Sequence, residues 1–300
     1  MNGSTTVIDL INEKFSSMSK GHKAISNYVL KNYDKAAFLT AAKLGEETGV
    51  SESTVVRFAS SLGFDGYPEF QKSLSELVRN RLNSIQRMEY TYERIDKSEI
   101  LSSVLTSDAE KIHQTLNEID REAFDNAVDT IAGASKIYVI GIRSCAPLAS
   151  FLAFYLNLIY DNVKLVNTSS ATEIFEQMVR IGPDDVVIGI SFPRYSLRTL
   201  KAMEFAGSRS AKLISITDSV NSPMTLYSSC NLIARSDMAS IVDSLTAPLS
   251  VVNALIVALC MRNQDHVIEN LSSLEKIWKE YEVYAADELE KANDKIILQE

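Results

Sequence analysis

From residue 136 onward, short runs of β-branched and apolar residues alternate with longer segments of helical periodicity. The five runs are KIYVIG, VKLV, DVVIGIS, KLISITD and CNLIA. Helical spacing predicts helices near 147–160, 171–181, 197–208 and 244–261, with a short helical turn after KLISITD. Near-continuous apolar runs separated by helices are typical of parallel strands buried on both faces. The alternation therefore predicts an α/β domain whose five-stranded parallel sheet is covered by helices on both faces.

Only helices are predicted before this domain, and a chain of 300 residues suits two domains. Apolar residues recur at helical spacing, as at Ile25, Tyr28 and Val29, without strand-like alternation. The tail after residue 263 has the same spacing and either covers its own domain or pairs with another subunit. We expect an all-helical domain over 1–88, a helical connector over 89–134, the α/β domain over 135–262 and an amphipathic helix over 263–300.

Charge is distributed unevenly along the chain. The formal net charge is −9, which opposes nucleic acid as a partner at face value. Residues 1–90, however, carry 11 Lys and Arg against 10 Asp and Glu, whereas the remainder carries 19 against 29. Attraction to phosphate acts locally, within a Debye length of ~10 Å. The first region can therefore meet DNA while the rest repels it.

The sequence offers no sign of export, membrane insertion or metal binding. The longest apolar run, Ala247–Met261, is interrupted by two polar residues and falls short of the ~18 residues that span a bilayer. The N-terminus MNGSTTVIDLINEKF lacks a basic region followed by an apolar stretch. The three cysteines form no CxxC, which argues against a disulfide framework and a zinc site. We expect a cytoplasmic protein without metal or membrane contact.

The segment LTAAKLGEETGVSESTVVRFASSLGF predicts two helices joined by a sharp turn. Thr40 is expected to cap the first helix and Ser51 the second, with Gly49 at the turn. A glycine within a helix costs ~1 kcal/mol, so Gly45 needs a packing reason, and a close crossing of the two helices supplies one. This is the helix-turn-helix arrangement, although a plain helical hairpin has the same pattern.

The second helix of this motif carries the side chains that we expect to contact DNA, namely Ser51, Glu52, Ser53, Thr54 and Arg57. Hydroxyl groups contact phosphates or bases, and an arginine contacts guanine or phosphate. Double-stranded operator DNA is therefore the predicted partner. One such helix contacts few base pairs, so we expect a homodimer, or a dimer of dimers, that matches half-sites ~34 to 36 Å apart.

The stretch TAAKLGEETGVSESTVVRFASSLGFDGYPEFQKSL resembles the N-terminal helix-turn-helix of the RpiR family of bacterial transcriptional regulators. In that family this domain is joined to a sugar isomerase (SIS) domain, and the two parts have the same order here, over about 4–262. The resemblance implies that the α/β part is a flavodoxin-like SIS sandwich. It also implies that a sugar phosphate or related anion regulates binding to the operator.

Two loops are expected at the ligand-binding end of the sheet. In an open parallel sheet, ligands bind beyond the carboxyl ends of the strands, near the point where the strand order reverses. GIRSCAP follows the first strand and SFPRYS follows the third. Arg143 stands where the dinucleotide-binding pattern GxGxxG has its second glycine, so no nicotinamide cofactor is expected, and we expect none of another kind.

SIS domains hold a phosphate with a GxGxS-like first loop and an SxSGxT-like second loop, and this chain departs from both patterns. Gly141 matches the first pattern, with Cys145 in place of its serine and Ser144 just before it. Ser191 matches the second pattern, and Ser196 stands for its threonine. These departures leave the identity of the ligand open.

Two arginines accompany the departures and favour an anionic ligand. Arg143 lies in the first loop. In the second loop, Pro193 stands in place of the second serine of the pattern and Arg194 in place of its glycine. Arginine forms strong, often bidentate hydrogen bonds to phosphate or carboxylate. Alternatively, both side chains are solvated or pair with Asp218 or Asp243. The expected ligand site comprises Gly141, Arg143, Ser144, Cys145, Ser191, Arg194 and Ser196.

Catalysis by the SIS domain is the alternative function. Aldose–ketose isomerisation needs a positioned base, usually His or Glu. The three histidines, His22, His113 and His266, lie outside the two loops. Glu173 is the best carboxylate candidate, but an ordinary glutamate in a first helical turn explains it as well. A pure interaction scaffold would leave the converging Ser and Arg residues unexplained. We therefore expect a regulator and not an enzyme.

Overall fold

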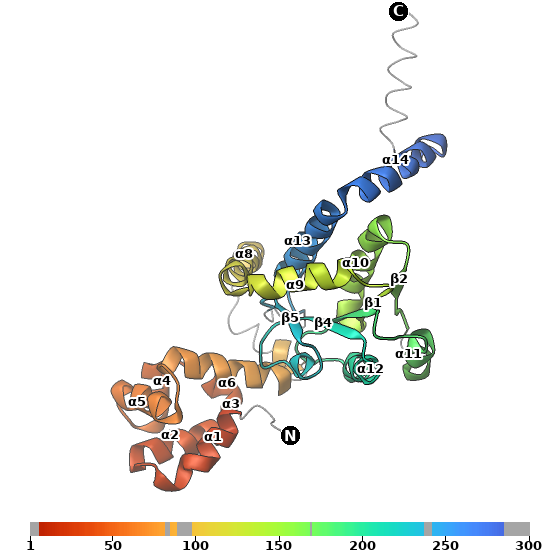
Figure 1. Cartoon of the computed structure of the whole chain (residues 1–300). Coiled ribbons are helices and arrows are strands. Elements are labelled where there is room, and N and C mark those ends of the chain that lie inside the picture. The colour runs from red at the N-terminus through yellow and green to blue at the C-terminus, as the bar shows by residue number, and fades with distance from the viewer. Residues whose placement is uncertain (1–5, 82–84, 89–97, 169, 237–241, 285–300) are drawn as a thin grey trace, which may run out of the picture. The chain divides into compact units, whose positions relative to one another are not determined.

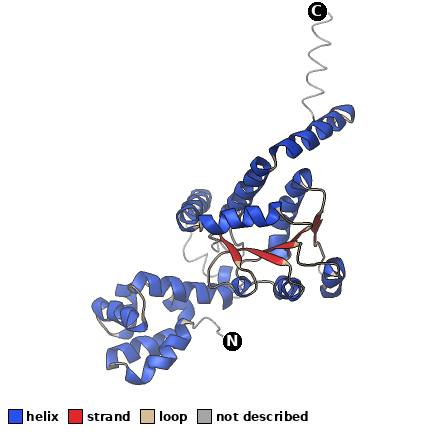
Figure 2. Cartoon of the chain, in the orientation of Figure 1, coloured by secondary structure: helices blue, strands red, loops and turns tan. Residues whose placement is uncertain are grey.

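The computed structural model describes residues 6–81, 85–88, 98–168, 170–236 and 242–284. Contacts between residues divide the chain into two compact units. The first unit includes residues 1–107 together with 193–195 and 237–244, and the second includes the remainder. Figure 2 shows that the described N-terminal part of the first unit is helical and that the five described strands, β1 to β5, belong to the second.

Within the described residues 6–81, six α-helices form the N-terminal part of the first unit: α1 (Val7–Lys14), α2 (Lys20–Lys31), α3 (Tyr33–Ala36), α4 (Ala41–Thr48), α5 (Glu52–Leu62) and α6 (Tyr67–Arg81). Side-chain caps begin several of them. The Thr6 hydroxyl accepts a hydrogen bond from Asp9 N, and the Asp9 carboxylate accepts one from Thr6 N. These reciprocal bonds satisfy amides that otherwise lack helical partners. The helix-only prediction for this part of the chain agrees with the described residues.

The helices of this unit enclose a single apolar core. Ile11, Ile25, Leu44, Phe58 and Phe70, from five different helices, are fully buried. The rings of Phe58 and Phe70 pack edge to face with their centroids 5.6 Å apart. Each buried side chain of this size contributes about 1.5–3 kcal/mol, so the core fixes the positions of α4 and α5.

Five parallel strands form the sheet of the second unit, as predicted: β1 (Ile137–Gly141), β2 (Val163–Leu165), β3 (Val186–Ile190), β4 (Lys212–Thr217) and β5 (Cys230–Ile233). Their order across the sheet is β2-β1-β3-β4-β5. This is the flavodoxin-like order, in which the direction of winding reverses between β1 and β3. The loops that leave β1 and β3 therefore flank the switch point of the sheet.

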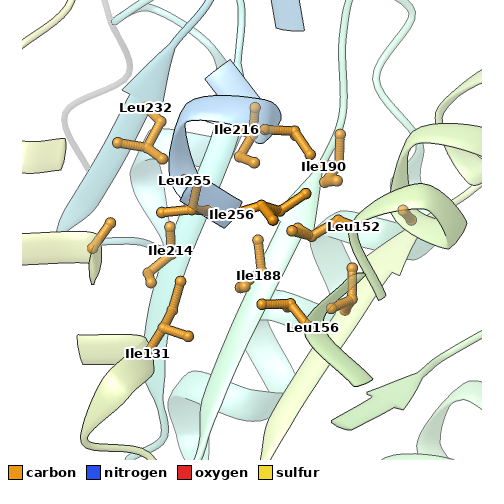
Figure 3. Packing of buried hydrophobic residues seen from close by; sticks show 14 of the residues in the cluster. Ile131, Leu152, Leu156, Ile188, Ile190, Ile214, Ile216, Leu232, Leu255 and Ile256 are labelled. Atoms are coloured by element: carbon orange, nitrogen blue, oxygen red, sulfur yellow. The ribbon is translucent and has the colours of Figure 1, made fainter. Parts of the chain in front are cut away.

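Helices cover both faces of this sheet (Figure 1). One face packs against α9 (Arg121–Ala132), α10 (Ala146–Ile159) and α13 (Thr246–Arg262), and the other against α11 (Ala171–Met178) and α12 (Leu197–Ser208). Figure 3 shows Leu152 and Leu156 of α10 with Leu255 of α13 against Ile188 and Ile214 of the strands. The observed architecture is the α/β sandwich that the alternating sequence predicts.

Gly189, in the middle of β3, lets α12 approach the sheet. A Cβ at this position would lie 2.5 Å from the Met203 sulfur and 2.9 Å from the Met224 Cε. Glycine within a strand marks such a close approach, because it leaves room for a neighbouring side chain. The glycine that interrupts the run DVVIGIS is thus explained by packing.

The stretch that precedes β1 contains α8 (Ile100–Glu118) as well as α9. Both helices lie within the expected connector, but Ala127, Val128 and Ile131 of α9 are buried in the core of the sheet. Residues 89–97, also part of that expected segment, lie outside the described residues. The helical prediction holds for the described part, and α9 is a layer of the α/β unit.

The last described helices are α13 and α14 (Gln264–Glu280). The helix expected over 263–300 ends at Glu280, where residues 281–284 form a turn, and residues 285–300 lie outside the described part. Among the described helices, none is by itself long and apolar enough to cross a membrane. The pair α13 and α14 reaches the necessary length and composition together, across a bend of 101°. Val252, Leu255 and Leu259 of α13 are fully buried, so its apolar surface serves the core.

Candidate functional site

The turn between α4 and α5 depends on two glycines. Gly49 ends α4 with φ +69°, a left-handed conformation that glycine adopts at little cost. Gly45 faces the turn, where an added Cβ would lie 2.8 Å from the Val50 carbonyl oxygen. The Val50 N–H in turn donates to the Gly45 carbonyl at 2.9 Å. The packing reason expected for Gly45 is therefore confirmed, and it sets the angle at which α5 leaves the turn.

Four of the five predicted DNA-contacting residues are exposed at the start of α5: Ser51, Glu52, Ser53 and Arg57. The fifth, Thr54, is half-buried. Arg57 lies back along the helix, with Nε donating to the Ser53 carbonyl at 3.3 Å and Nη2 to Thr54 Oγ1 at 3.4 Å. The structure thus brings these side chains together on the N-terminal half of the helix, as base readout by a recognition helix requires.

Ser51 departs from its expected role. It occupies the N-cap position of α5, but its hydroxyl makes no hydrogen bond to a backbone amide of the helix. Ser51 Oγ instead lies 3.0 Å from Ser53 Oγ and 2.9 Å from Thr54 Oγ1. The neighbouring hydroxyls compete with the backbone for this side chain. The result is a small hydroxyl cluster at the tip of α5.

The N-terminus of α2 lies beside the same tip, a contact that no local sequence pattern predicts. An added Cβ on Gly21 would lie 3.3 Å from Thr54 Cγ2. The His22 ring packs edge to face on Phe58, with centroids 5.6 Å apart. Burial, followed by the positive charge of Arg57, lowers the pKa of His22. No local pattern in the sequence links His22 to Arg57, which lies 35 positions away, so this contact could not be predicted.

The loop after β1 has two exposed residues followed by a buried one. Arg143 and Ser144 are exposed, whereas Cys145 is 5% exposed and belongs to the apolar core of the sheet. A Cβ on Gly141 would lie 2.7 Å from the Cys145 carbonyl oxygen and 3.0 Å from Ala149 Cβ, so this glycine allows the start of α10 to approach β1. Cys145 was predicted to contact the ligand, but its side chain packs in the apolar core of the sheet.

The loop after β3 is closed by its own serines. Ser191 is 2% exposed, and its Oγ accepts a hydrogen bond from Ser196 N at 3.1 Å. Ser196 Oγ caps α12 by accepting from Thr199 N at 3.3 Å. These two bonds fix the beginning and end of SFPRYS, while Arg194 between them is exposed. The N-terminus of a helix so capped is electropositive and favours anions.

Both predicted arginines adopt a left-handed backbone conformation, Arg143 with φ +60° and Arg194 with φ +63°. A residue with a side chain pays roughly 1–3 kcal/mol for such a conformation, and strain of this kind concentrates at functional sites. Gly141 and Ile190 are register partners, so the loops that carry the two arginines leave adjacent strands at the switch point. The sequence indicated the charges of these loops but not their backbone conformation.

The end of β4 and the loop that follows it support the loop after β3, and they were not predicted as part of the site. Thr217 Oγ1 donates to the Ser191 carbonyl at 2.9 Å and is hydrogen-bonded to Ser222 Oγ at 2.7 Å. Asp218 beside it is 4% exposed. Asp243, considered above as a partner for the loop arginines, accepts a hydrogen bond from Arg87 Nη1 at 2.7 Å. The run KLISITD signalled a strand, but its polar end gave no sign of this support.

Glu173 lies in the first turn of α11 and is exposed. Its carboxylate accepts a hydrogen bond from Thr168 Oγ1, and its backbone amide donates to Ser170 Oγ at 3.5 Å. A carboxylate in this position stabilises the start of a helix. Within the described ranges, no three His, Cys, Asp or Glu side chains are grouped as a metal site would need.

Two family models match the chain in the predicted order. Residues 5–81 match the helix-turn-helix domain of the rpiR family, and residues 130–258 match the SIS domain. The chain belongs to the RpiR family. An uncharacterized HTH-type transcriptional regulator of Clostridium perfringens is 25% identical over 224 residues, covering 74% of this chain and 79% of that protein. HexR, an HTH-type transcriptional regulator of Escherichia coli, is 23% identical over 287 residues, covering 91% and 94%.

Two solved structures share the fold. The sugar isomerase domain of an RpiR transcription factor from Sphaerobacter thermophilus is 27% identical, with a TM-score of 0.57, and covers 59% of this chain and 99% of that one. The Vibrio vulnificus NanR protein, solved in complex with ManNAc-6P, has a TM-score of 0.57 at 19% identity and covers 90% and 97%. The likeness of fold to NanR thus extends over 90% of this chain.

Proposed function

We propose that this RpiR-family chain is a DNA-binding transcriptional regulator whose SIS domain binds an anionic metabolite, a sugar phosphate, and thereby alters operator binding. The observation that carries the proposal is the pair of arginines with left-handed backbone in the loops that follow β1 and β3, in a chain that also has a helix-turn-helix. A regulator of chromosomal DNA acts in the cytoplasm, which is the compartment that we assign to it.

The DNA site consists of four exposed residues and one half-buried threonine at the start of α5. Their hydroxyl and guanidinium groups suit phosphate and base contacts, and Glu52 suits the amino group of cytosine. The Ser53 and Thr54 contacts that hold Arg57 reduce the conformational freedom lost on binding. We assign DNA contact to Ser51, Glu52, Ser53, Thr54 and Arg57.

The ligand site consists of the polar residues that follow β1 and β3. A phosphate bound at the capped start of α12 gains from the helix dipole, and an arginine adds a charge-assisted hydrogen bond. NanR, which shares the fold, binds ManNAc-6P, and this supports a sugar phosphate as the ligand class. We assign ligand binding to Gly141, Arg143, Ser144, Ser191, Arg194 and Ser196, with Cys145 packing beneath the first loop.

A homodimer is the assembly that we propose. Helix α8 exposes a series of large apolar side chains, namely Ile100, Leu101, Leu105, Ile112 and Leu116. Two of these, Ile112 and Leu116, also line a largely apolar cavity of about 520 Å³ between α8, α9 and α13. An apolar surface of this extent calls for a partner, and a palindromic operator calls for a second copy. Sedimentation or light scattering of the full chain measures the assembly.

Catalysis is not part of the proposal. Glu173, the candidate base, is held by Thr168 and by the start of α11, which suits a structural role. Incubation with sugar phosphates tests this directly, because a regulator leaves them unchanged whereas an isomerase converts them. Aldose–ketose interconversion by the purified full chain would refute this part of the proposal.

Two variants, each of which removes one of the two proposed sites, give the decisive experiment. Arg194→Ala is expected to keep operator binding without ligand and to lose the effect of the sugar phosphate on it. Arg57→Ala is expected to keep ligand binding and to lose DNA. Calorimetry with ManNAc-6P, glucose 6-phosphate and inorganic phosphate, together with DNA retention, measures both. Typical couplings between two sites are ~1–3 kcal/mol, or about 5- to 150-fold in DNA affinity. A normal ligand response in Arg194→Ala would refute the ligand site.

A further inference from the structure

Val56 is an apolar side chain on the surface that faces DNA in the proposed function. It lies in α5, immediately before Arg57, and is 39% exposed. Within residues 6–81, it is the large apolar residue that the structure leaves exposed, whereas Val55 and Phe58 beside it are fully buried. The core of the unit is therefore complete without the Val56 side chain.

Helix geometry places Val56 among the residues assigned to DNA contact. Residues three or four apart lie on the same face of a helix, so Val56 shares a face with Glu52, Ser53 and Ser60. All three of these are exposed polar residues. An isopropyl group in the middle of a polar surface gains nothing from water, but it gains from an apolar group on the surface that docks there.

The major groove of DNA presents one apolar group, the 5-methyl group of thymine, and short apolar side chains on a recognition helix contact it. We infer that Val56 packs against a thymine methyl group in each half-site and so determines base specificity at that position. This inference rests on the proposed DNA-binding function. It adds a nonpolar determinant to a site that otherwise consists of hydroxyl, carboxylate and guanidinium groups.

Selection from a random double-stranded DNA library with the full chain identifies the operator and begins the test. Each enriched half-site is expected to contain a thymine at one fixed position. Replacing that thymine by deoxyuridine removes only the methyl group and should weaken binding by about fourfold per half-site. If no sequence is enriched, the proposed DNA-binding function fails, and this inference fails with it. An enriched site without a fixed thymine overturns this inference alone.

Val56→Ala separates the methyl contact from other effects. The variant should bind the thymine and deoxyuridine operators with equal affinity, because its shorter side chain does not reach the methyl group. Val179→Ala, a matched change at a 56% exposed valine outside the DNA site, should keep the wild-type preference for thymine. Circular dichroism verifies that both variants are folded.

Two results would overturn the assignment of Val56. One is a wild-type protein that binds every deoxyuridine-substituted operator as tightly as the thymine operator. The other is a folded Val56→Ala variant that still discriminates between them. If Val56→Ala changes the oligomeric state and leaves the discrimination intact, the side chain belongs to a protein interface and the inference is wrong.

Discussion

The close approach of α4 to the turn before α5 makes Gly45→Ala a sharp test of how the DNA-binding unit is built. Helix propensity favours the change, because Ala is better than Gly within a helix by about 1 kcal/mol. Packing opposes it, since the new Cβ would lie 2.8 Å from the Val50 carbonyl oxygen. That oxygen belongs to the backbone, so no side-chain rotation relieves the contact, and the turn itself has to move.

The structure indicates which effect is larger. Relief of the contact requires the distance to grow from 2.8 Å to about 3.4 Å, which strains the 2.9 Å hydrogen bond from Val50 N to the Gly45 carbonyl. Overpacking costs about 1–3 kcal/mol, and loss of one hydrogen bond costs about 1 kcal/mol. After the gain in propensity, the expected net loss of stability is about 1–3 kcal/mol.

Amide hydrogen exchange of the full chain measures this loss locally, in peptides that span residues 40–62. Exchange there should be about 5- to 150-fold faster in Gly45→Ala than in the parent protein. Ala42→Gly, at an exposed position of the same helix, isolates the propensity effect and should cost about 1 kcal/mol. If Gly45→Ala slows exchange instead, propensity outweighs packing and the reasoning about the turn is refuted.

Three further outcomes are expected. Arg57→Ala should weaken operator binding by about 1–3 kcal/mol and reduce its dependence on salt, as measured by fluorescence anisotropy at several salt concentrations; unchanged affinity in the folded variant would contradict the assignment. The pKa of His22 is lowered in the folded unit, by burial and then by Arg57, so the unfolded state binds the proton more readily. The contribution of His22 to the stability of the helical unit should therefore be complete above the ordinary His pKa of about 6.5 and should be lost as the pH falls below it. In thermal melts, the melting temperature of His22→Gln should depend less on pH than that of the parent protein. An identical pH profile in the two proteins would show that His22 does not cause the dependence. Gly141→Ala places a Cβ 2.7 Å from the Cys145 carbonyl oxygen, so the free energy of unfolding of the α/β unit in urea should fall by about 1–3 kcal/mol. An unchanged urea midpoint would show that the start of α10 moves away from β1 at no cost.

Periodicity and glycine placement were sufficient to predict the architecture. The run DVVIGIS predicted β3, and the helical spacing after residue 40 predicted α4 and α5, because burial imposes a period that the residues themselves display. The need for close packing at Gly45 was likewise visible, since a helical glycine is otherwise unfavourable. Features that local patterns specify were thus predictable.

The remainder depends on contacts between distant residues or on backbone geometry. Cys145 lies in the core although the loop pattern suggested a ligand contact, because the 3-10 turn over Arg143–Cys145 directs it inward. His22 meets Arg57 and Phe58 only through the packing of α2 on α5. Exposure of Val56 follows from completion of the core by Val55 and Phe58. No local pattern specifies these relations.

In the proposed ligand site, the left-handed conformations of Arg143 and Arg194 make the backbone path of the two loops independent of their charge. A glycine can occupy either position without disturbing the path of the chain, and it relieves strain while removing a guanidinium. Charge at these two positions is therefore an exchangeable property of an otherwise constant frame. If these arginines bind the effector as proposed, single substitutions at either position change the number of anionic groups that the site accepts while the backbone stays the same.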